Sequence, residues 1–361
     1  MIPNIYKGEY RLLLVFPLAL VVAAVLLLPG LKLGVDFRGG TLITMQALNS
    51  PDADLMESEL LAAGFDADVR VYEGELGRTA EVEVSQTDQM VRAEALKREF
   101  AAQIEKVAFL EAESNVNESV AAEYMGERAK LDGMADEMFA LGGLNAGASA
   151  YSNLNRLQDR FNEAYMRVSD LQLERVMKIV DRHIEYTSRS ATTVSPALSE
   201  HFLEKAGMVV LMSAALSVVM VFLFFRTLVP SIAVITGAFC DLIIALGAMS
   251  LFGIPLTLPS FAALLMLVGY SLDTDVLLTM RMMKRRGNPR DNAFDAMKTG
   301  MTMSMTAIVA FFVLFVVSMI THVSTYYEIS AVALAGLVGD IFATWCLNAV
   351  MMIYYKERMS G

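Results

Sequence analysis

Four aspartates lie within long apolar stretches of this 361-residue chain, and they are the side chains best suited to chemistry. They are Asp241, Asp273, Asp275 and Asp340. A carboxylate at the centre of a bilayer costs about 2.5–3.5 kcal/mol even on lenient insertion scales. A membrane helix that keeps such groups is therefore expected to use them, and reversible proton binding is the chemistry they offer.

No Lys, Arg or His lies within these apolar stretches to neutralise the acids. Burial disfavours the charged form of a carboxyl group, and neighbouring carboxylates disfavour it further. We therefore expect part of the set to be protonated at neutral pH, with Asp273 as the first candidate for a proton site. A passive, hydrogen-bonded role for the same carboxyls is the alternative that stays open.

A glycine stands four residues before three of the aspartates, at Gly237, Gly269 and Gly336. Residues four apart share a helix face, and glycine allows a neighbouring helix to approach closely. The spacing predicts that these three aspartates face packed neighbours rather than lipid. Asp275 is two residues from Asp273 and is predicted to point to nearly the opposite side of its helix.

The elements that hold these acids are apolar stretches long enough to span a bilayer, which takes about 20 residues. They run over 12–29, 206–225, 229–252, 257–280, 303–320 and 328–353, and 55% of the chain is hydrophobic. A polar stretch, 30–205, is long enough to form its own core. We expect a first span within 1–29, a water-soluble domain over 30–205, and a five-span bundle over 206–361.

Charge divides unevenly between these parts. Residues 31–205 hold 18 Lys and Arg against 31 Asp and Glu, a net of −13, and the remainder holds 11 against 9, or +2, for a total of −11. An acidic domain argues against nucleic-acid binding. Cys240 and Cys346 both fall inside spans, so neither a disulfide framework nor a metal site is expected.

Basic residues gather in alternate loops, before the first span, after the second, within 281–300 and after the last, while 253–256 and 321–327 have none. Cytoplasmic loops carry an excess of Lys and Arg. We therefore expect a multi-pass protein of the cytoplasmic membrane, with both termini cytoplasmic and 30–205 outside. The loop 281–300 would meet anionic lipid headgroups, and the first span, which lacks a small-residue cleavage pattern, would remain as an anchor.

The soluble domain begins with the order β-α-β-β-α, which is typical of a ferredoxin-like α+β fold. Residue patterns predict strands at 41–48, 69–72 and 80–85, helices at 54–64 and 89–110, and a closing strand near 190–194. The intervening residues, about 111–187, are predicted to form a helical hairpin with a Gly-rich tip, inserted into this fold. Packing against its own domain and binding a partner both remain open for the hairpin.

The segment Gly34-Val35-Asp36-Phe37-Arg38-Gly39-Gly40-Thr41 follows the first span. Its glycines indicate a tight turn that leads into a strand, without the spacing that phosphate binding needs. The segment resembles the signature of the SecF family, the smaller partner in SecDF protein-export complexes of the RND superfamily. The matching residues are Gly34, Asp36, Phe37, Gly39 and Gly40.

Motifs in the spans strengthen this resemblance. Gly269-Tyr270-Ser271-Leu272 resembles the fourth-span motif of SecF, and Cys240-Asp241-Leu242 is similar to its His-Asp-Val. Gly339-Asp340-Ile341, with Thr344-Trp345 and Asn348, is similar to the archaeal branch. The sequence Leu272-Asp273-Thr274-Asp275-Val276 departs toward the pattern of SecD. Bacterial relatives also carry an arginine in a Ser-Arg-Thr context, where this chain has Ser304-Met305-Thr306, so a proton relay that depends on that arginine cannot run in the same way.

The resemblance implies a six-span, RND-like half-bundle that pairs with SecD and assists the Sec translocon channel, with proton flow as the drive. The external domain would engage the translocating polypeptide, and neither enzymatic chemistry nor a cofactor is implied. A stand-alone RND-type exporter of lipid or small molecules and a non-energised translocon scaffold remain as alternatives. Intramembrane aspartyl proteolysis is disfavoured, because its motifs are broken and out of order here.

Overall fold

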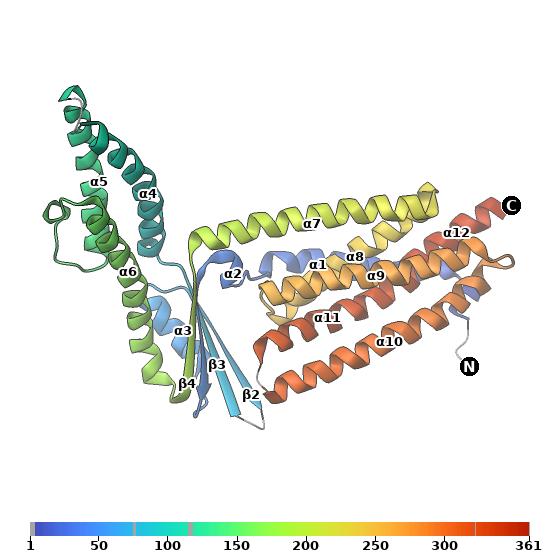
Figure 1. Ribbon diagram of the computed structural model, residues 1–361. Helices are drawn as coiled ribbons and strands as arrows, with labels where there is room; N and C mark the ends of the chain where they lie inside the picture. Colours follow the sequence, from blue (N-terminus) through green and yellow to red (C-terminus); the bar gives the residue numbers. More distant parts are fainter. Residues whose placement is uncertain (1–3, 75–76, 115–117, 322, 361) are drawn as a thin grey trace. The chain divides into compact units, whose positions relative to one another are not determined.

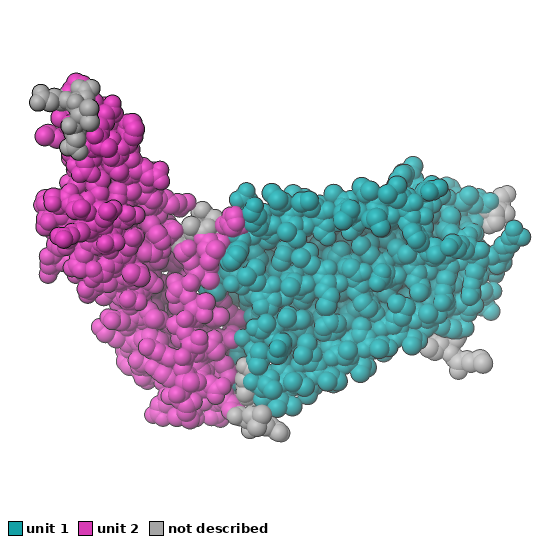
Figure 2. Space-filling view, in the orientation of Figure 1, with its two compact units in different colours: residues 1–37, 72–76, 202–361 teal, residues 38–71, 77–201 magenta. Residues whose placement is uncertain are grey.

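The computed structural model describes residues 4–74, 77–114, 118–321 and 323–360. Residues 1–3, 115–117 and 322, which belong to the predicted N-terminal segment, insertion and outer loop, lie outside that description. The chain forms two compact units (Figure 1, Figure 2). The first, here the membrane unit, comprises Met1–Phe37, Tyr72–Leu76 and Phe202–Gly361, and the second, the sheet unit, comprises Arg38–Val71 and Gly77–His201.

Long apolar helices make up the membrane unit, as the apolar stretches predict. They are α1 (Val15–Leu27), α7 (Pro196–Phe225, which belongs to this unit from Phe202 onward), α8 (Leu228–Phe252), α9 (Leu258–Lys284), α10 (Pro289–Thr321), α11 (Ser324–Phe342) and α12 (Ala349–Ser360). A π-helical segment, Ala343–Asn348, joins α11 to α12. Short 3₁₀ turns at Ile5–Lys7, Tyr10–Leu14 and Leu28–Gly30 flank α1. The described residues contain six segments long and apolar enough to cross a membrane, which confirms the predicted number.

Helices α8, α9 and α11 pack against one another at the centre of the bundle. Helix α1 packs on α8, and α10 packs on α9 and α11, whereas α7 is largely exposed. Apolar residues cover nearly every face of these helices, so their sequence periodicity indicates poorly which face is buried. The inward faces are fixed by long-range contacts between helices.

The Gly34–Phe37 part of the signature segment is attached to the start of α9. The backbone N–H of Gly34 donates to the carbonyl of Leu256 over 2.8 Å. Asp36, in the one-turn helix α2 (Val35–Arg38), accepts a 2.9 Å hydrogen bond from the backbone N–H of Leu258. A carboxylate at this position satisfies one of the unpaired amides at a helix N-terminus. The segment thereby ties the acid-bearing helix α9 to the residues that precede the sheet.

The next two residues turn the chain into the sheet. Gly39 and Gly40 have φ angles of +72° and +139°, which side-chain-bearing residues rarely adopt. A Cβ on Gly40 would also lie 2.3 Å from the carbonyl oxygen of Val84 in the neighbouring strand. The predicted glycine turn that leads into a strand is therefore confirmed.

The sheet unit contains one four-stranded sheet. Its strands are β1 (Gly40–Ala47), β2 (Ala67–Gly74), β3 (Gly77–Ser85) and β4 (Tyr186–Val194), in the order β2-β3-β1-β4, with β1 antiparallel to β3 and β4. Helix α3 (Ala53–Ala62) follows β1, and the carboxylate of Asp52 caps it by accepting from the backbone N–H of Leu55 over 3.1 Å. This is the strand order of the predicted ferredoxin-like fold.

Two separate hydrophobic cores divide the helices of the sheet unit. Helices α4 (Asp88–Ser114), α5 (Ala121–Leu141) and the first part of α6 (Leu154–His183) form one core, where the rings of Phe100 and Phe161 stack at 3.9 Å. Short 3₁₀ turns at Glu118–Val120 and Ala148–Ala150 connect them. The other core contains one sheet face, α3 and the end of α6 from Val176 to Ile184.

The second helix of the ferredoxin-like fold is therefore the end of α6, and the predicted assignment of 89–110 to that role was wrong. The insertion limits of about 111–187 were wrong for the same reason. The inserted arm consists of α4, α5 and the first part of α6, whereas the end of α6 packs on the sheet. Both helices carry an apolar stripe. Order along the chain alone does not reveal which of them covers the sheet.

Candidate functional site

The centre of the membrane unit brings three of the four aspartates together. Asp241 lies on α8, Asp275 on α9 and Asp340 on α11, and each exposes 1% or less of its surface. Their three helices pack against one another, so the acids share one buried polar site. We call these three residues the carboxyl cluster.

Uncharged side chains donate hydrogen bonds to the carboxyl cluster. The hydroxyl of Ser271 donates to Asp241. The amide of Asn348 donates to Oδ1 of Asp275 over 2.7 Å. The hydroxyls of Thr274 and Thr344 lie 3.0 and 3.2 Å from Oδ1 of Asp340 and donate to it. Neutral donors hold the carboxyls in place without cancelling their charge.

Asp241 and Asp340 are neighbours in this site and interact electrostatically. Two carboxylates can share a hydrogen bond only if one of them holds a proton, and neighbouring negative charges oppose ionisation of both. Asp241 Oδ1, Asp275 Oδ2 and Asp340 Oδ2 have no donor among the side and main chains that the structure describes. The cluster is thus a set of acceptor atoms suited to binding protons.

Two of the three predicted glycine contacts are present. A Cβ on Gly237 would lie 2.2 Å from Oδ2 of Asp275, and one on Gly336 would lie 2.2 Å from a methyl carbon of Leu267. Both glycines therefore allow close contact with α9. Gly269 has no atom within 4 Å of its Cβ position, so the prediction of a packed neighbour there was wrong.

Asp273 is exposed on the surface of the membrane unit, whereas Asp275 is fully buried. The prediction that Asp273 faces the packed side of its helix and Asp275 points away was therefore wrong. The inward face of α9 is set by its contacts with α8 and α11, and it carries Leu267, Ser271 and Thr274. Gly269 lies on the opposite, exposed face together with Asp273.

Sequence reasoning assigned no role to Thr274, and it identified Ser271, Thr344 and Asn348 only through family motifs. A signal was present, because Asp340, Thr344 and Asn348 follow one another at four-residue intervals in an apolar span. Thr344 and Asn348 lie in the π-helical segment, whose carbonyl at Trp345 accepts a 2.8 Å hydrogen bond from the buried hydroxyl of Tyr6. Such π-helical turns are frequent at functional sites.

The remaining fourth- and fifth-span motif residues lie beside this site. Tyr270 of α9 lies next to Ser304 of α10, and the side chain of Ser304 is fully buried. Met305, at the position of the bacterial arginine, exposes 52% of its surface and is not part of the carboxyl cluster. No residue of this chain replaces that arginine among the described donors to the cluster.

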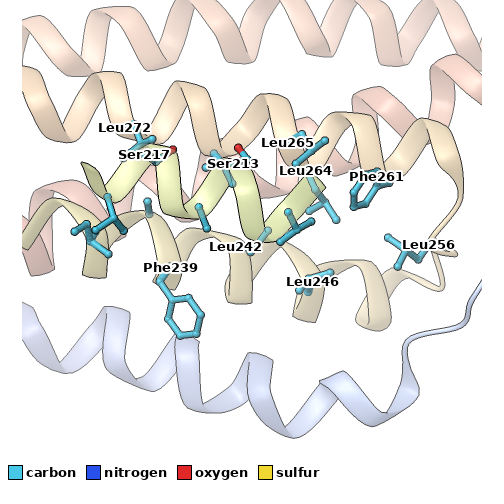
Figure 3. A pocket seen from close by; sticks show the side chains of 16 residues that line it. Ser213, Ser217, Phe239, Leu242, Leu246, Leu256, Phe261, Leu264, Leu265 and Leu272 are labelled. Atoms are coloured by element: carbon cyan, nitrogen blue, oxygen red, sulfur yellow. The ribbon is translucent and has the colours of Figure 1, made fainter. Parts of the chain in front are cut away.

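The membrane unit also contains an apolar cavity of about 340 Å³ between α7, α8 and α9 (Figure 3). Its walls are apolar side chains such as Phe239, Leu242 and Leu264, with the hydroxyls of Ser213 and Ser217 at one side. None of the aspartates lines it. The side chains that line this cavity therefore include no carboxyl group.

Family comparisons match two parts of the chain. The family described as "Protein export membrane protein SecD/SecF, C-terminal" matches residues 172–358, just over half of the chain. The "SecD/SecF GG Motif" matches residues 24–47, which include the glycine turn before β1. The first match contains the whole carboxyl cluster.

Several archaeal proteins named "Protein-export membrane protein SecF" are similar to the chain. The protein of Methanothermobacter thermautotrophicus is 44% identical over 177 residues, 48% of this chain and 62% of that relative. The protein of Methanocaldococcus jannaschii is 42% identical over 169 residues, 46% of this chain and 60% of that relative. The chain thus matches less than two thirds of the length of these relatives. The Thermococcus gammatolerans protein is 32% identical over 240 residues, 65% of this chain and 70% of that relative.

Among solved structures, the crystal structure of SecDF, a translocon-associated membrane protein from Thermus thermophilus, has a similar fold. The comparison gives a TM-score of 0.62 at 17% identity and covers 99% of this chain and 39% of that one. At this identity the likeness concerns the fold alone. The family matches and the archaeal relatives together show that the chain belongs to the SecD/SecF family of protein-export membrane proteins, in the branch of the archaeal SecF proteins.

Proposed function

We propose that this chain acts with SecD as an accessory subunit of the Sec protein-export machinery, and that proton binding at the carboxyl cluster drives its movement. Family membership supports the export role, and the cluster supports the proton coupling. In this proposal the chain performs no covalent chemistry and needs no cofactor.

The observation that carries the proton coupling is the meeting of three buried carboxyls from three helices with only neutral donors around them. Loss of a shared proton would leave Asp241 and Asp340 as neighbouring anions in a medium that screens charge poorly. Their repulsion would favour separation of α8 from α11. Protonation would allow the two helices to close again, so proton exchange and helix packing are coupled.

The start of α9 offers a route from this movement to the sheet unit. Asp275 lies on α9, and the N-terminus of that helix is bonded to Asp36 in the signature segment. The segment continues through Gly39 and Gly40 into β1, the strand that pairs with both β3 and β4. A shift of α9 would therefore pull on the chain at the point where it enters the sheet.

The distribution of charge supports an orientation with both termini in the cytoplasm and the sheet unit outside. In that orientation the sheet unit would meet the translocating polypeptide beside the Sec channel. Arg281, Arg285 and Arg290 would lie on the cytoplasmic side, near anionic lipid headgroups.

Replacement of each cluster residue by asparagine tests the proton coupling. Asp241→Asn, Asp275→Asn and Asp340→Asn keep size and hydrogen bonding but remove titration. We expect each variant to insert, to bind SecD and to lower export in cells to the rate without the protein, as measured by pulse-chase of a secreted substrate.

The matched control is Asp291→Asn, which removes a carboxylate at an exposed position on α10. The side chain of Asp291 accepts a hydrogen bond from the side-chain amide of Asn4. This control is expected to export normally at equal protein level. Full export by all three cluster variants would instead make the carboxyls structural and the chain a translocon scaffold.

A further inference from the structure

Tyr6 is a buried residue of the segment that precedes the first span. It lies in the 3₁₀ turn Ile5–Lys7 and exposes none of its surface. Its ring belongs to a hydrophobic core that it shares with residues of α10, α12 and the π-helical segment. The backbone N–H of Tyr6 donates to the side-chain oxygen of Asn4 over 2.9 Å. The tyrosine is therefore held inside the membrane unit rather than on its surface.

The hydroxyl of Tyr6 donates to the carbonyl of Trp345 over 2.8 Å. Trp345 is itself fixed in place, because it exposes only 1% of its surface and its ring packs directly on α10. A Cβ on Gly300 of α10 would lie 2.1 Å from that ring. The bond from Tyr6 thus joins the segment before the first span to a rigid point of the π-helical segment.

The carbonyl of Trp345 lies where π-helical bonding changes to α-helical bonding. The backbone N–H of Ala349 donates five residues back, to the carbonyl of Thr344. In α12, which begins at Ala349, each amide donates four residues back. The amide that follows Ala349 therefore bypasses the carbonyl of Trp345. A buried carbonyl needs a partner, and the hydroxyl of Tyr6 supplies one at this junction.

The π-helical segment directs two donors at the carboxyl cluster. Asp340, Thr344 and Asn348 follow one another at four-residue intervals, and eight residues of a regular α-helix turn about 80° beyond two full turns. A π-helix, with its bonds to the fifth residue, has a wider turn and reduces this drift. The hydroxyl of Thr344 thereby lies 3.2 Å from Oδ1 of Asp340, and the amide of Asn348 lies 2.7 Å from Oδ1 of Asp275.

We propose that Tyr6 is a positioning residue for the carboxyl cluster, and that its hydroxyl stabilises the π-helical register of Ala343–Asn348. The inference rests on the proposed function and deepens it, since it makes the segment before the first span part of the control of proton binding. Without this donor, a regular α-helical turn is the better bonded arrangement. Such a turn would move Asn348 away from Asp275.

Tyr6→Phe tests the inference, because it removes the hydroxyl and keeps the ring. Thr344 and Asn348 donate to the carboxyl groups, and such donors favour the charged form. With these donors turned away, the cluster should keep its protons to a pH about one unit higher, which is a tenfold change in proton affinity.

The measurement is a pH titration of the infrared band of protonated carboxyl groups, with the purified chain in lipid nanodiscs. It is followed at pH values where exposed carboxyl groups are already ionised. Asp275→Asn identifies the part of the band that belongs to the cluster.

Tyr10→Phe is the matched control. Tyr10 exposes 4% of its surface in the same hydrophobic core, and its hydroxyl donates to Glu357 of α12 over 2.7 Å rather than to the π-helical segment. Both variants lose one hydroxyl from a buried tyrosine, so a general loosening of the bundle would shift both titrations. A shift with Tyr6→Phe alone is expected. Equal shifts for the two variants, or no shift with Tyr6→Phe, would overturn the inference.

A combined substitution tests the route through the helix. In a chain that carries Thr344→Val and Asn348→Ala, Tyr6→Phe should add no further shift, because the donors that it positions are gone. A shift of full size in that chain would contradict positioning through the π-helical segment.

Amide hydrogen exchange gives a second measurement on the same variant. Tyr6→Phe should speed exchange over residues 343–350 and leave exchange in α8 and α9 unchanged, which also shows that the bundle is folded. Unchanged exchange over 343–350 would contradict a role in holding the π-helical register.

These results separate the inference from the proposed function, because the infrared titration requires neither SecD nor export. If Tyr6→Phe shifts the titration while the asparagine variants of the cluster export normally, the positioning role stands and the proton coupling fails. If those variants lose export while Tyr6→Phe titrates like the unmodified chain, the proposed function stands and the inference fails.

Discussion

Gly237 controls how closely α8 approaches α9 beside the carboxyl cluster. Its Cβ position lies 2.2 Å from Oδ2 of Asp275, whose other oxygen is bonded to Asn348. We predict that Gly237→Ala pushes this carboxyl away from Asn348 and destabilises the protein by about 1–3 kcal/mol, as overpacking does in other cores. The melting temperature in detergent would show the loss.

Gly207→Ala is the matched control for this substitution. Gly207 is also within a membrane helix, and no atom lies within 4 Å of its Cβ position. Both variants gain the same helix propensity, so their difference isolates the clash at Asp275. Equal melting temperatures for the two variants would contradict the prediction. They would show that α8 and α9 move apart at Gly237 without a measurable loss of stability.

For single residues, the sequence indicated that carboxyl groups lie in the membrane. It did not indicate which of these groups lie close together. The unfavourable burial of an acid can be read from its position in an apolar stretch. The choice between Asp273 and Asp275 depends on where α8 and α11 contact α9, and these contacts join residues far apart in the chain. The four-residue spacing of Gly269 and Asp273 was misleading because both lie on the exposed face.

Among the elements, the inserted arm of the sheet unit should be separable from the sheet. The hydroxyl of Thr87 and the side-chain oxygen of Gln172 lie 3.1 Å apart, so the arm leaves and returns at neighbouring points. We predict that a short Gly/Ser linker in place of residues 88–171 leaves the protein inserted and bound to SecD. Membrane accumulation and SecD recovery measure this outcome.

Deletion of residues 111–187 provides the contrast. It would remove Val176, Met177, Ile179 and Val180, which are buried against the sheet. Loss of several large buried side chains costs about 2–5 kcal/mol for each. This variant should fail to accumulate, and accumulation of both variants or of neither would contradict the division into two cores.

Element types were predictable where the pattern is local. Alternation predicted the strands, and the helix predicted at 54–64 corresponds to α3. Chain order predicted the ferredoxin-like sheet. The role of α6 was not predictable, because one continuous helix serves both cores and no break in its sequence marks the change.

For the whole molecule, the orientation in the membrane is a prediction from loop charge. A cysteine at the exposed position Asn145 should react with an impermeant maleimide in intact cells, and one at exposed Arg286 should react only after permeabilisation. Gly142 is unsuitable as a labelling site, because its Cβ position lies 2.6 Å from the carbonyl oxygen of Ala164.

The labelling requires a background without Cys240 and Cys346, with each single cysteine then added back. Reaction of Arg286→Cys in intact cells, with Asn145→Cys protected, would reverse the orientation. The six spans could be predicted from hydropathy because bilayer thickness dictates their length. The side that each loop faces is a property of the whole membrane, which the fold of one chain does not contain.

The continuity of α6 has a mechanical consequence. The helix has 30 residues, Leu154–His183, and contains neither proline nor glycine, so it forms a rod about 45 Å long without a joint. Its C-terminal end is held by the sheet and its N-terminal end carries the arm. A tilt of about 10° at the sheet end would therefore displace the N-terminal end by about 8 Å, which is more than the pitch of one helical turn.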